Sequence, residues 1–313
     1  MEGESKKEGI VIKSTGKRYT VIGTDQKQYT CHIKGRFRME GFKTTNPIAV
    51  GDHVIFDAGK DQDSYVVTAI KERKNYIIRK ASNLSKLYHI VAANIDLAIL
   101  VITVKHPVTT TEFIDRFLIT SEAYSIPVLL LFNKEDIYDE GDMKELNWLT
   151  EIYMSIGYDC LKVSAISQHN LDVLIKKMSN KVSLISGNSG VGKSTLINCL
   201  NPSLNLKVNS ISEYHLSGKH TTTFAEMFPL PGGGYIIDTP GIKGFGVIDF
   251  TKDELYHYFP EIFKISGNCK FHNCLHINEP QCAVKEAVQE GNISESRYFN
   301  YLSILLDEDS KYR

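Results

Sequence analysis

The fold is decided by the stretch Gly187-Asn188-Ser189-Gly190-Val191-Gly192-Lys193-Ser194. This is the pattern of a phosphate-binding loop, in which backbone N–H groups wrap the phosphates, Lys193 reaches the β and γ oxygens and the Ser194 hydroxyl binds magnesium. The apolar run 182–186 predicts the buried strand that precedes such a loop, and residues 194–200 predict the helix that follows it. Residues 187–194, with Thr195 beside them, are therefore predicted to bind nucleotide phosphates.

A candidate motif for recognising guanine precedes this loop. Asn133-Lys134-Glu135-Asp136 directly follows the apolar run 127–132. The Asp136 carboxylate can accept from both N1–H and the exocyclic amine of guanine, a pair that adenine does not offer. A second strand ends in Val163-Ser164-Ala165, where a loop that backs the base is expected, and open α/β sheets bind ligands at such strand ends. Guanine is thus predicted to be bound by Asn133, Lys134, Asp136, Ser164 and Ala165.

Two further nucleotide motifs follow the phosphate loop. The first is Gly218-Lys219-His220-Thr221-Thr222-Thr223, and the second is Asp238-Thr239-Pro240-Gly241 after the strand 234–237. Asp238 is expected to hold magnesium through a water, and the Gly241 amide to contact the γ-phosphate. Thr222 is expected to complete the magnesium shell, although a threonine cluster is also typical of an ordinary polar loop.

The order of these motifs is base, base-backing loop, phosphate loop, first switch and second switch. This is a circular permutation, which leaves a site intact when all its loops leave one edge of one parallel sheet. The second switch then runs directly into the C-terminal segment. A change in the second switch between the GTP and GDP states is therefore expected to be transmitted to that segment.

Three of the six cysteines lie within the last 45 residues, and they surround a histidine in the pattern C-x4-C-x-H-x5-C. Three thiolates and one imidazole close a tetrahedral zinc shell with no open position, so the pattern predicts a structural zinc. Free buried cysteines beside a surface histidine are the alternative. A second histidine, His272, competes as a ligand.

The motif order, the GKHTTT and DTPG segments and the cysteine cluster together resemble the RsgA (YjeQ) family of circularly permuted GTPases that mature the small ribosomal subunit. The resemblance covers essentially the whole chain. It implies hydrolysis of GTP with Mg²⁺, and GTP or GDP as ligand. It also implies binding to the small ribosomal subunit and its rRNA as a late assembly or checkpoint factor. One structural Zn²⁺ is implied, with Cys269, Cys274, His276 and Cys282 as its ligands.

The N-terminal segment is predicted to be a small basic barrel. Residues 1–80 carry 16 Lys and Arg against 10 Asp and Glu, whereas the rest of the chain is acidic. Five short strands in about 70 residues suit an oligonucleotide-binding (OB) barrel: Gly9–Ile12, Tyr19–Ile22, Tyr29–Ile33, Val54–Phe56 and Tyr65–Ile70. A basic segment is the expected footprint of RNA, with a solvated charged face as the alternative. The loop before the fourth strand is predicted to contact RNA, because its cations and aromatics suit phosphate contact and base stacking; core positions for the two aromatics are the alternative. These residues are Lys34, Arg36, Arg38 and Lys43, with Phe37 and Phe42 between them.

The fold class is therefore multi-domain α/β. We expect an OB barrel over residues 1–80, a circularly permuted P-loop GTPase domain over 81–246 and a zinc-binding helical domain over 247–313. In the central part, buried strands alternate with amphipathic helical stretches at 111–124, 143–156 and 171–178, a pattern typical of a parallel sheet with helices on both faces. A linker is expected near 80–83.

Membrane insertion and secretion are not expected. Residues 1–7 form no apolar leader, and the longest aliphatic run, 97–104, is too short to cross a bilayer. We expect a cytoplasmic monomer.

The residue that orients the attacking water is not given by the usual GTPase motif. Ras-type enzymes orient the attacking water with a glutamine after the D-x-x-G glycine, and Ile242 occupies that position here. His220 is the nearest substitute, because an imidazole titrates near neutrality, and the resemblance implies that a histidine at this place acts on the water; Lys193 is the second catalytic candidate. Two alternatives remain: a P-loop enzyme of another class, such as a nucleotide-dependent kinase, and a GTP-liganded RNA-binding protein without turnover.

Overall fold

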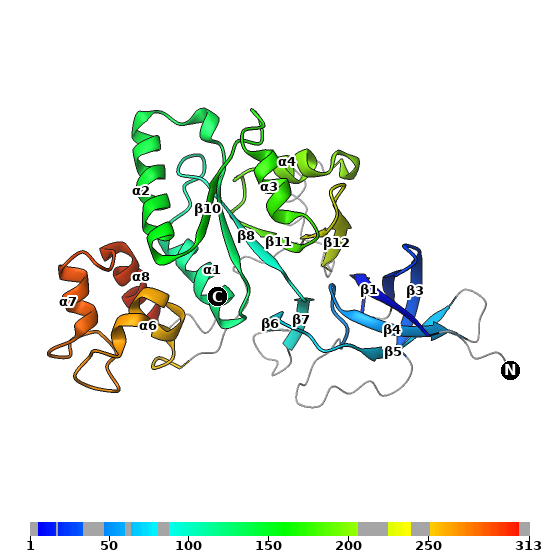
Figure 1. The fold of residues 1–313 in the computed structure, drawn as a ribbon, viewed down its shortest axis with the longest axis horizontal. Coiled ribbons are helices and arrows are strands. Elements are labelled where there is room, and N and C mark those ends of the chain that lie inside the picture. Colours follow the sequence, from blue (N-terminus) through cyan, green and yellow to red (C-terminus); the bar gives the residue numbers. More distant parts are fainter. Residues whose placement is uncertain are drawn as a thin grey trace, which may run out of the picture. The chain divides into compact units, whose positions relative to one another are not determined.

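The computed structural model describes residues 6–16, 18–33, 47–59, 64–80, 88–205, 225–238 and 251–306. The chain divides into two compact units, and each is formed by three separate segments. The first holds residues 1–99, 171–186 and 193–242, and the second holds residues 100–170, 187–192 and 243–313. Figure 1 shows the course of the chain from the blue N-terminal strands to the orange and red C-terminal helices.

The first unit begins with a closed five-stranded barrel. Its strands are β1 (Lys7–Ser14), β2 (Tyr19–Gly23), β3 (Gln28–Ile33), β4 (His53–Ala58) and β5 (Tyr65–Ile70). They hydrogen-bond in the order β1-β2-β3-β5-β4, and an antiparallel β1–β4 ladder closes the barrel. Side chains from alternate positions fill the interior, among them Val11, Tyr19, Cys31 and Phe56. All five predicted strands are therefore confirmed.

A short hairpin follows the barrel. It pairs β6 (Tyr76–Lys80) with β7 (Tyr88–Ala93) in an antiparallel ladder. The expected linker near residues 80–83 lies largely outside the described part of the chain, and the sequence analysis did not predict the hairpin. The polar residues Ser82 and Asn83 between the two strands had been interpreted as part of a linker between domains instead of as a hairpin connection.

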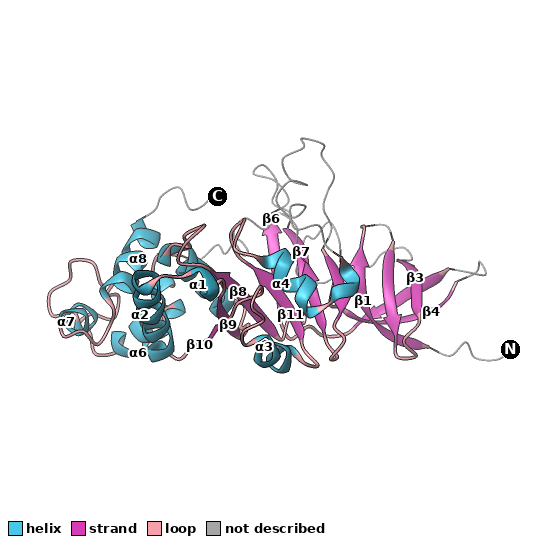
Figure 2. Ribbon diagram, turned by 90° about the horizontal axis from the view of Figure 1, so that it is seen from above, coloured by secondary structure: helices cyan, strands magenta, loops and turns pink. Residues whose placement is uncertain are grey.

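The first unit also contains β11 (Val182–Ser186), β12 (Glu226–Pro229) and β13 (Tyr235–Asp238). β11 and β13 pair in parallel, and β12 pairs antiparallel with β13. Helices α3 (Leu171–Met178) and α4 (Lys193–Leu200), drawn in cyan beside these strands in Figure 2, share one apolar hollow, because Ile175 and Met178 of α3 and Leu200 of α4 line it together. η2 (Pro202–Leu204) follows α4.

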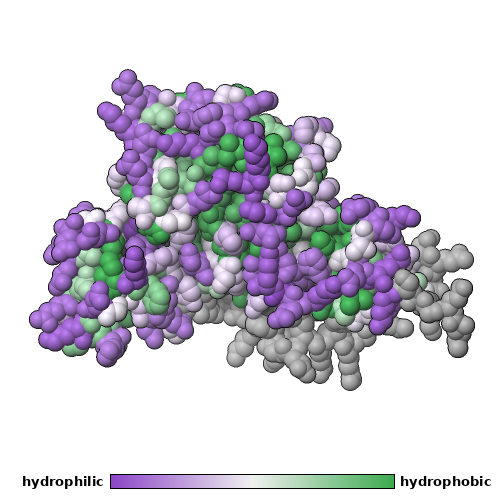
Figure 3. Space-filling view, in the orientation of Figure 1, coloured by the Kyte–Doolittle hydropathy of each residue, from purple (hydrophilic) through white to green (hydrophobic). Residues whose placement is uncertain are grey.

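An apolar patch lies on the described surface of the first unit. Ile175 of α3 is 42% exposed and lies beside Leu230 and Pro231 of the β12–β13 turn. Apolar side chains gather over α3 in the space-filling view (Figure 3).

The strand β8 (Leu97–Ile102) begins in the first unit and ends in the second. The second unit continues with α1 (Thr111–Ala123), β9 (Val128–Phe132), η1 (Glu135–Ile137), α2 (Glu140–Ile156) and β10 (Asp159–Lys162). β9 and β10 pair in parallel. Every residue of β8 is buried, as expected for a central strand of a parallel sheet.

In the C-terminal part of the second unit, the described residues form helices joined by loops. These helices are η3 (Leu255–Tyr258), α6 (Pro260–Ser266), α7 (Ala283–Gln289) and α8 (Glu295–Leu306). Their shared core contains Phe259, Ile262, Tyr301 and Ile304, and it also takes in Ile119 of α1. No helix in the described ranges is long and apolar enough to span a membrane.

Candidate functional site

The phosphate loop follows β11, and three of its glycines have a positive φ. These angles are 145° at Gly187, 84° at Gly190 and 97° at Gly192. A Cβ at Gly187 would lie 2.5 Å from the Val101 carbonyl oxygen, and one at Gly192 would lie 2.5 Å from the Asn133 amide nitrogen. The glycines are needed both for backbone conformation and for close approach of the neighbouring strand ends.

The loop leads into α4 at Lys193. The buried Ser194 lies in the first turn of that helix. The first N–H groups of a helix have no partner within it and its dipole favours anions, so this arrangement suits a phosphate. The predicted strand, loop and helix are all present.

Asn133 joins the guanine motif to the phosphate loop and to the base-backing loop. Its side chain is 1% exposed, and its Nδ2 donates to the Val191 carbonyl in the phosphate loop at 2.9 Å. Its Oδ1 accepts from the Ala165 amide at 3.3 Å. Asn133 thus fixes the base motif against the phosphate loop on one side and against the base-backing loop on the other.

Lys134 makes a second connection. It has a left-handed backbone (φ 69°), and its Nζ donates to the carbonyls of Gly190 at 2.6 Å and His106 at 2.5 Å. Burial lowers the pKa of its ammonium, although Asp136 opposes the shift. The lysine therefore acts as a brace between loops rather than as a solvated charge.

The carboxylate of Asp136 is held by the loop that was predicted to back the base. Its Oδ1 accepts from the Ser164 hydroxyl at 2.5 Å, and the same hydroxyl accepts from the Ser167 amide at 3.0 Å. These bonds orient the carboxylate and tie η1 to the loop after β10. A carboxylate held in this way offers the acceptor pair that guanine requires.

Sequence reasoning missed Tyr138. Its hydroxyl donates to the Asn133 carbonyl at 2.6 Å and accepts from the Val104 amide at 3.2 Å. Burial raises the pKa of Tyr138 to about 12, so the phenol keeps its proton and remains a donor. The spacing within N-K-x-D gives no signal for it, because one of its partners lies 34 residues away.

The contact between the Glu135 carboxylate and the His169 ring was also missed. The two side chains lie 2.7 Å apart and connect η1 to the base-backing loop.

The switch residues are not placed. His220, Thr222, Gly241 and Ile242 lie outside the described residues, as do Arg36 and Arg38 of the barrel loop. Asp238 is the last residue of β13, but its side chain is not described.

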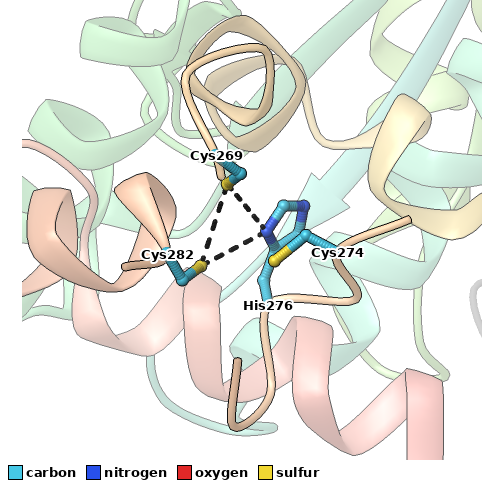
Figure 4. Close-up of side chains that lie close together, drawn as sticks. All are labelled: Cys269, Cys274, His276 and Cys282. Carbon is cyan, nitrogen blue, oxygen red and sulfur yellow. Dashed lines mark hydrogen bonds between the residues drawn. The ribbon is translucent and has the colours of Figure 1, made fainter. Parts of the chain in front are cut away.

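The four predicted zinc ligands come together in the second unit. The ligand atoms of Cys269, Cys274, His276 and Cys282 all lie within 4.8 Å of one another (Figure 4). His276 Nδ1 is 3.6 Å from the Cys269 sulfur and 3.5 Å from the Cys282 sulfur, which are themselves 3.9 Å apart. A tetrahedral zinc with ordinary bond lengths needs separations of about 3.6–3.8 Å.

The chemistry of this group also fits a cation. Burial raises the pKa of the Cys274 thiol to about 12 and, opposed by nearby Glu279, lowers the pKa of His276. A bound metal would stabilise the thiolates and neutral imidazole that such a site requires. His272 is exposed and is not part of the group, so the competing ligand set is not supported.

A P-loop site in which the guanine motif precedes the phosphate loop defines the class of protein: a circularly permuted P-loop GTPase. Comparison with known proteins gives the particular family. The RsgA GTPase family model matches residues 70–248, and the RsgA N-terminal domain model matches residues 8–66. The chain belongs to the RsgA GTPase family, and its activity is GTP hydrolysis.

Several relatives are similar over almost their whole length. A protein of Bacteroides fragilis named small ribosomal subunit biogenesis GTPase RsgA is 55% identical, covering 97% of this chain and 98% of its own. A relative of the same name from Christiangramia forsetii is 54% identical, with 98% of each chain covered.

Solved structures agree with the fold. YjeQ from Thermotoga maritima superposes with a TM-score of 0.78 at 35% identity, covering 96% of this chain and 98% of that one. YloQ, described as a circularly permuted GTPase, superposes with a TM-score of 0.77 at 30% identity, covering 100% and 99%. The predicted fold class and family are confirmed.

Proposed function

We propose that this GTPase acts in late assembly of the small ribosomal subunit, and that the subunit stimulates its GTP hydrolysis. The binding of a guanine nucleotide is supported by one observation: the side chains of Asn133 and Lys134 donate hydrogen bonds to carbonyls of the phosphate loop. These bonds connect the predicted guanine motif with the predicted phosphate site. The partner is supported by the names of the two relatives above.

Within this proposal, the base is bound by Asn133, Lys134 and Asp136, with Ser164 and Ala165 behind it. The phosphates are bound by residues 187–195, and the γ-phosphate is contacted by the Gly241 amide. Magnesium would be held by Ser194, by Thr222 and, through a water, by Asp238; it neutralises charge on the β- and γ-phosphates. Lys193 stabilises the charge that develops on those phosphates.

The attacking water is assigned to His220. An imidazole can accept a proton or orient a water near neutral pH. Ile242 can do neither, so hydrolysis by the free protein is expected to be slow. Binding to the subunit would place His220 correctly, and hydrolysis would then release the protein.

The barrel is proposed as the main RNA contact. Its segment carries the excess of positive charge, and cations interleaved with aromatics suit phosphate contact and base stacking. The division into residues 1–80, 81–246 and 247–313 assigns RNA binding, nucleotide turnover and a structural zinc to separate domains. We further propose that the protein acts as a monomer in the cytoplasm, without a membrane partner.

The decisive experiment measures GTP turnover by the full chain alone, with purified small subunits, with large subunits and with bare RNA. We expect turnover to increase with small subunits and not with large subunits or bare RNA. Equal rates in all four conditions would reject the subunit-dependent function, and phosphate transfer to a second substrate would indicate a kinase instead. Subunit binding without any turnover would indicate an RNA-binding protein that uses GTP as a structural ligand.

A further inference from the structure

Glu279 lies in the loop 269–282, between the predicted ligands His276 and Cys282. Its carboxylate accepts hydrogen bonds from three backbone amides of that loop. Its Oε1 accepts from the Leu275 amide at 2.8 Å, and its Oε2 accepts from the amides of Ile277 at 2.8 Å and Asn278 at 3.0 Å. Three backbone donors of one short segment therefore converge on a single side chain.

The residue enclosed by these bonds is His276. Its φ of 58° places it in the left-handed region, which residues with a side chain seldom adopt without support from their surroundings. Glu279 holds the amide immediately before His276 and the amide immediately after it. The carboxylate thus stabilises the backbone conformation from which the imidazole projects.

The carbonyls of the same segment are held by hydroxyl groups of α8. The hydroxyl of Tyr298 donates to the His276 carbonyl at 2.7 Å, and that of Tyr301 donates to the Leu275 carbonyl at 2.9 Å. Both tyrosines belong to α8. With its backbone fixed by Glu279 and α8, His276 directs Nδ1 toward the sulfurs of Cys269 and Cys282 (Figure 4).

We propose that Glu279 is a positioning residue of the metal site: it sets His276 in its ligating geometry before the metal binds. The inference rests on the proposed zinc site. None of the bonds of Glu279 involves an atom that would ligate the metal. Its effect on metal affinity would therefore come from preorganisation, because less ordering remains to be done when the ion binds.

The test compares Glu279→Gln with Glu286→Gln in the full chain. Glutamine keeps the length of the side chain, but it replaces one acceptor oxygen with a donor that faces backbone N–H groups. Glu286 is exposed on α7 and serves as the matched control. Zinc affinity is measured by competition with a chromophoric chelator, and zinc loss is timed after addition of excess chelator.

We expect Glu279→Gln to bind zinc at least about tenfold more weakly than wild type and to lose it faster, the lower end of effects seen for residues behind metal ligands. Glu286→Gln should match wild type. Wild-type affinity in Glu279→Gln would overturn the role of Glu279 while leaving the zinc site intact. A wild-type protein without zinc affinity would instead reject the zinc site itself.

A further measurement distinguishes a role of Glu279 in positioning His276 from a role in fold stability alone. If purified Glu279→Gln is unfolded in its C-terminal segment, refolding it in excess zinc is expected to restore the C-terminal helices, because the free energy of zinc binding can replace the lost preorganisation. Failure of zinc to restore them would show that Glu279 serves the fold alone, and this too would overturn the proposal.

Discussion

Arg297 and Asp115 are 182 residues apart in the sequence and form an ion pair of 2.6 Å in which both side chains are completely buried. Arg297 also contacts both carboxylate oxygens of Glu261, at 2.7 and 3.1 Å. Asp115 in turn accepts from Tyr153 and Asn300. The network connects α1 and α2, which flank the guanine motif in the sequence, to α6 and α8 of the C-terminal segment.

The first prediction concerns the stability of this network. Arg297→Met leaves the buried carboxylate of Asp115 without its cation, and removing one member of a buried pair costs about 3–5 kcal/mol. The free energy of unfolding, measured with urea, should fall by that amount. Arg116→Met is the control, because Arg116 pairs with Glu112 at the surface, where such pairs contribute less than about 1 kcal/mol. Equal effects of the two variants would contradict the assigned importance of Arg297.

The second prediction concerns guanine. Asp136→Asn presents a donor where the base needs an acceptor, so GTP should bind more weakly and xanthosine triphosphate more tightly. Competition for a fluorescent nucleotide measures both affinities. If the wild-type protein binds ATP as tightly as GTP, Asp136 does not recognise the base.

A third prediction follows from Tyr138. Tyr138→Phe removes the bond to the Asn133 carbonyl and leaves the Val104 amide unpaired. Loss of about 1.4 kcal/mol, the size of a neutral hydrogen bond, should weaken GDP binding about tenfold. Turnover at saturating GTP should change much less, so KM should respond more than kcat.

Tyr158→Phe is the matched control for this experiment, because the Tyr158 hydroxyl contacts Glu122 instead of the base motif. An unchanged GDP affinity in Tyr138→Phe would show that Asn133 and Lys134 hold the motif without it.

The residues that sequence could predict are those fixed by local spacing. The phosphate loop, N-K-x-D and the four zinc ligands each lie within a short segment whose chemistry requires those residue types at those intervals. Arg297 depends instead on Asp115, 182 residues away, and Tyr138 depends on Val104, 34 residues away, as well as on nearby Asn133. No sequence spacing predicts such distant pairs. Glu279 lies close in sequence to the groups it binds, but its role depends on the left-handed conformation of His276, which cannot be predicted from the residue type.

A fourth prediction tests the proposed RNA contact. Arg36→Glu together with Arg38→Glu should weaken binding to small subunits and lower its dependence on salt. Each lost phosphate contact reduces the slope of log K against log salt by about one unit. Titrations at several salt concentrations measure this slope. Unchanged binding would place the RNA contact elsewhere, with the C-terminal helical domain as the next candidate.

The last prediction concerns the attacking water. Ile242 removes the side chain that orients the water in Ras-type enzymes, so stimulated turnover must depend on another group, and His220 precedes the threonines expected around magnesium. His220→Ala should retain GTP affinity and subunit binding, while stimulated turnover falls about a hundredfold, the lower end for a positioned acid or base. Ser194→Ala provides the contrast, because loss of a magnesium ligand should impair productive nucleotide binding as well as turnover. Full stimulated activity in His220→Ala would mean that the ribosome or another switch residue orients the water, because the nucleotide and its partner would still be bound while the imidazole was gone.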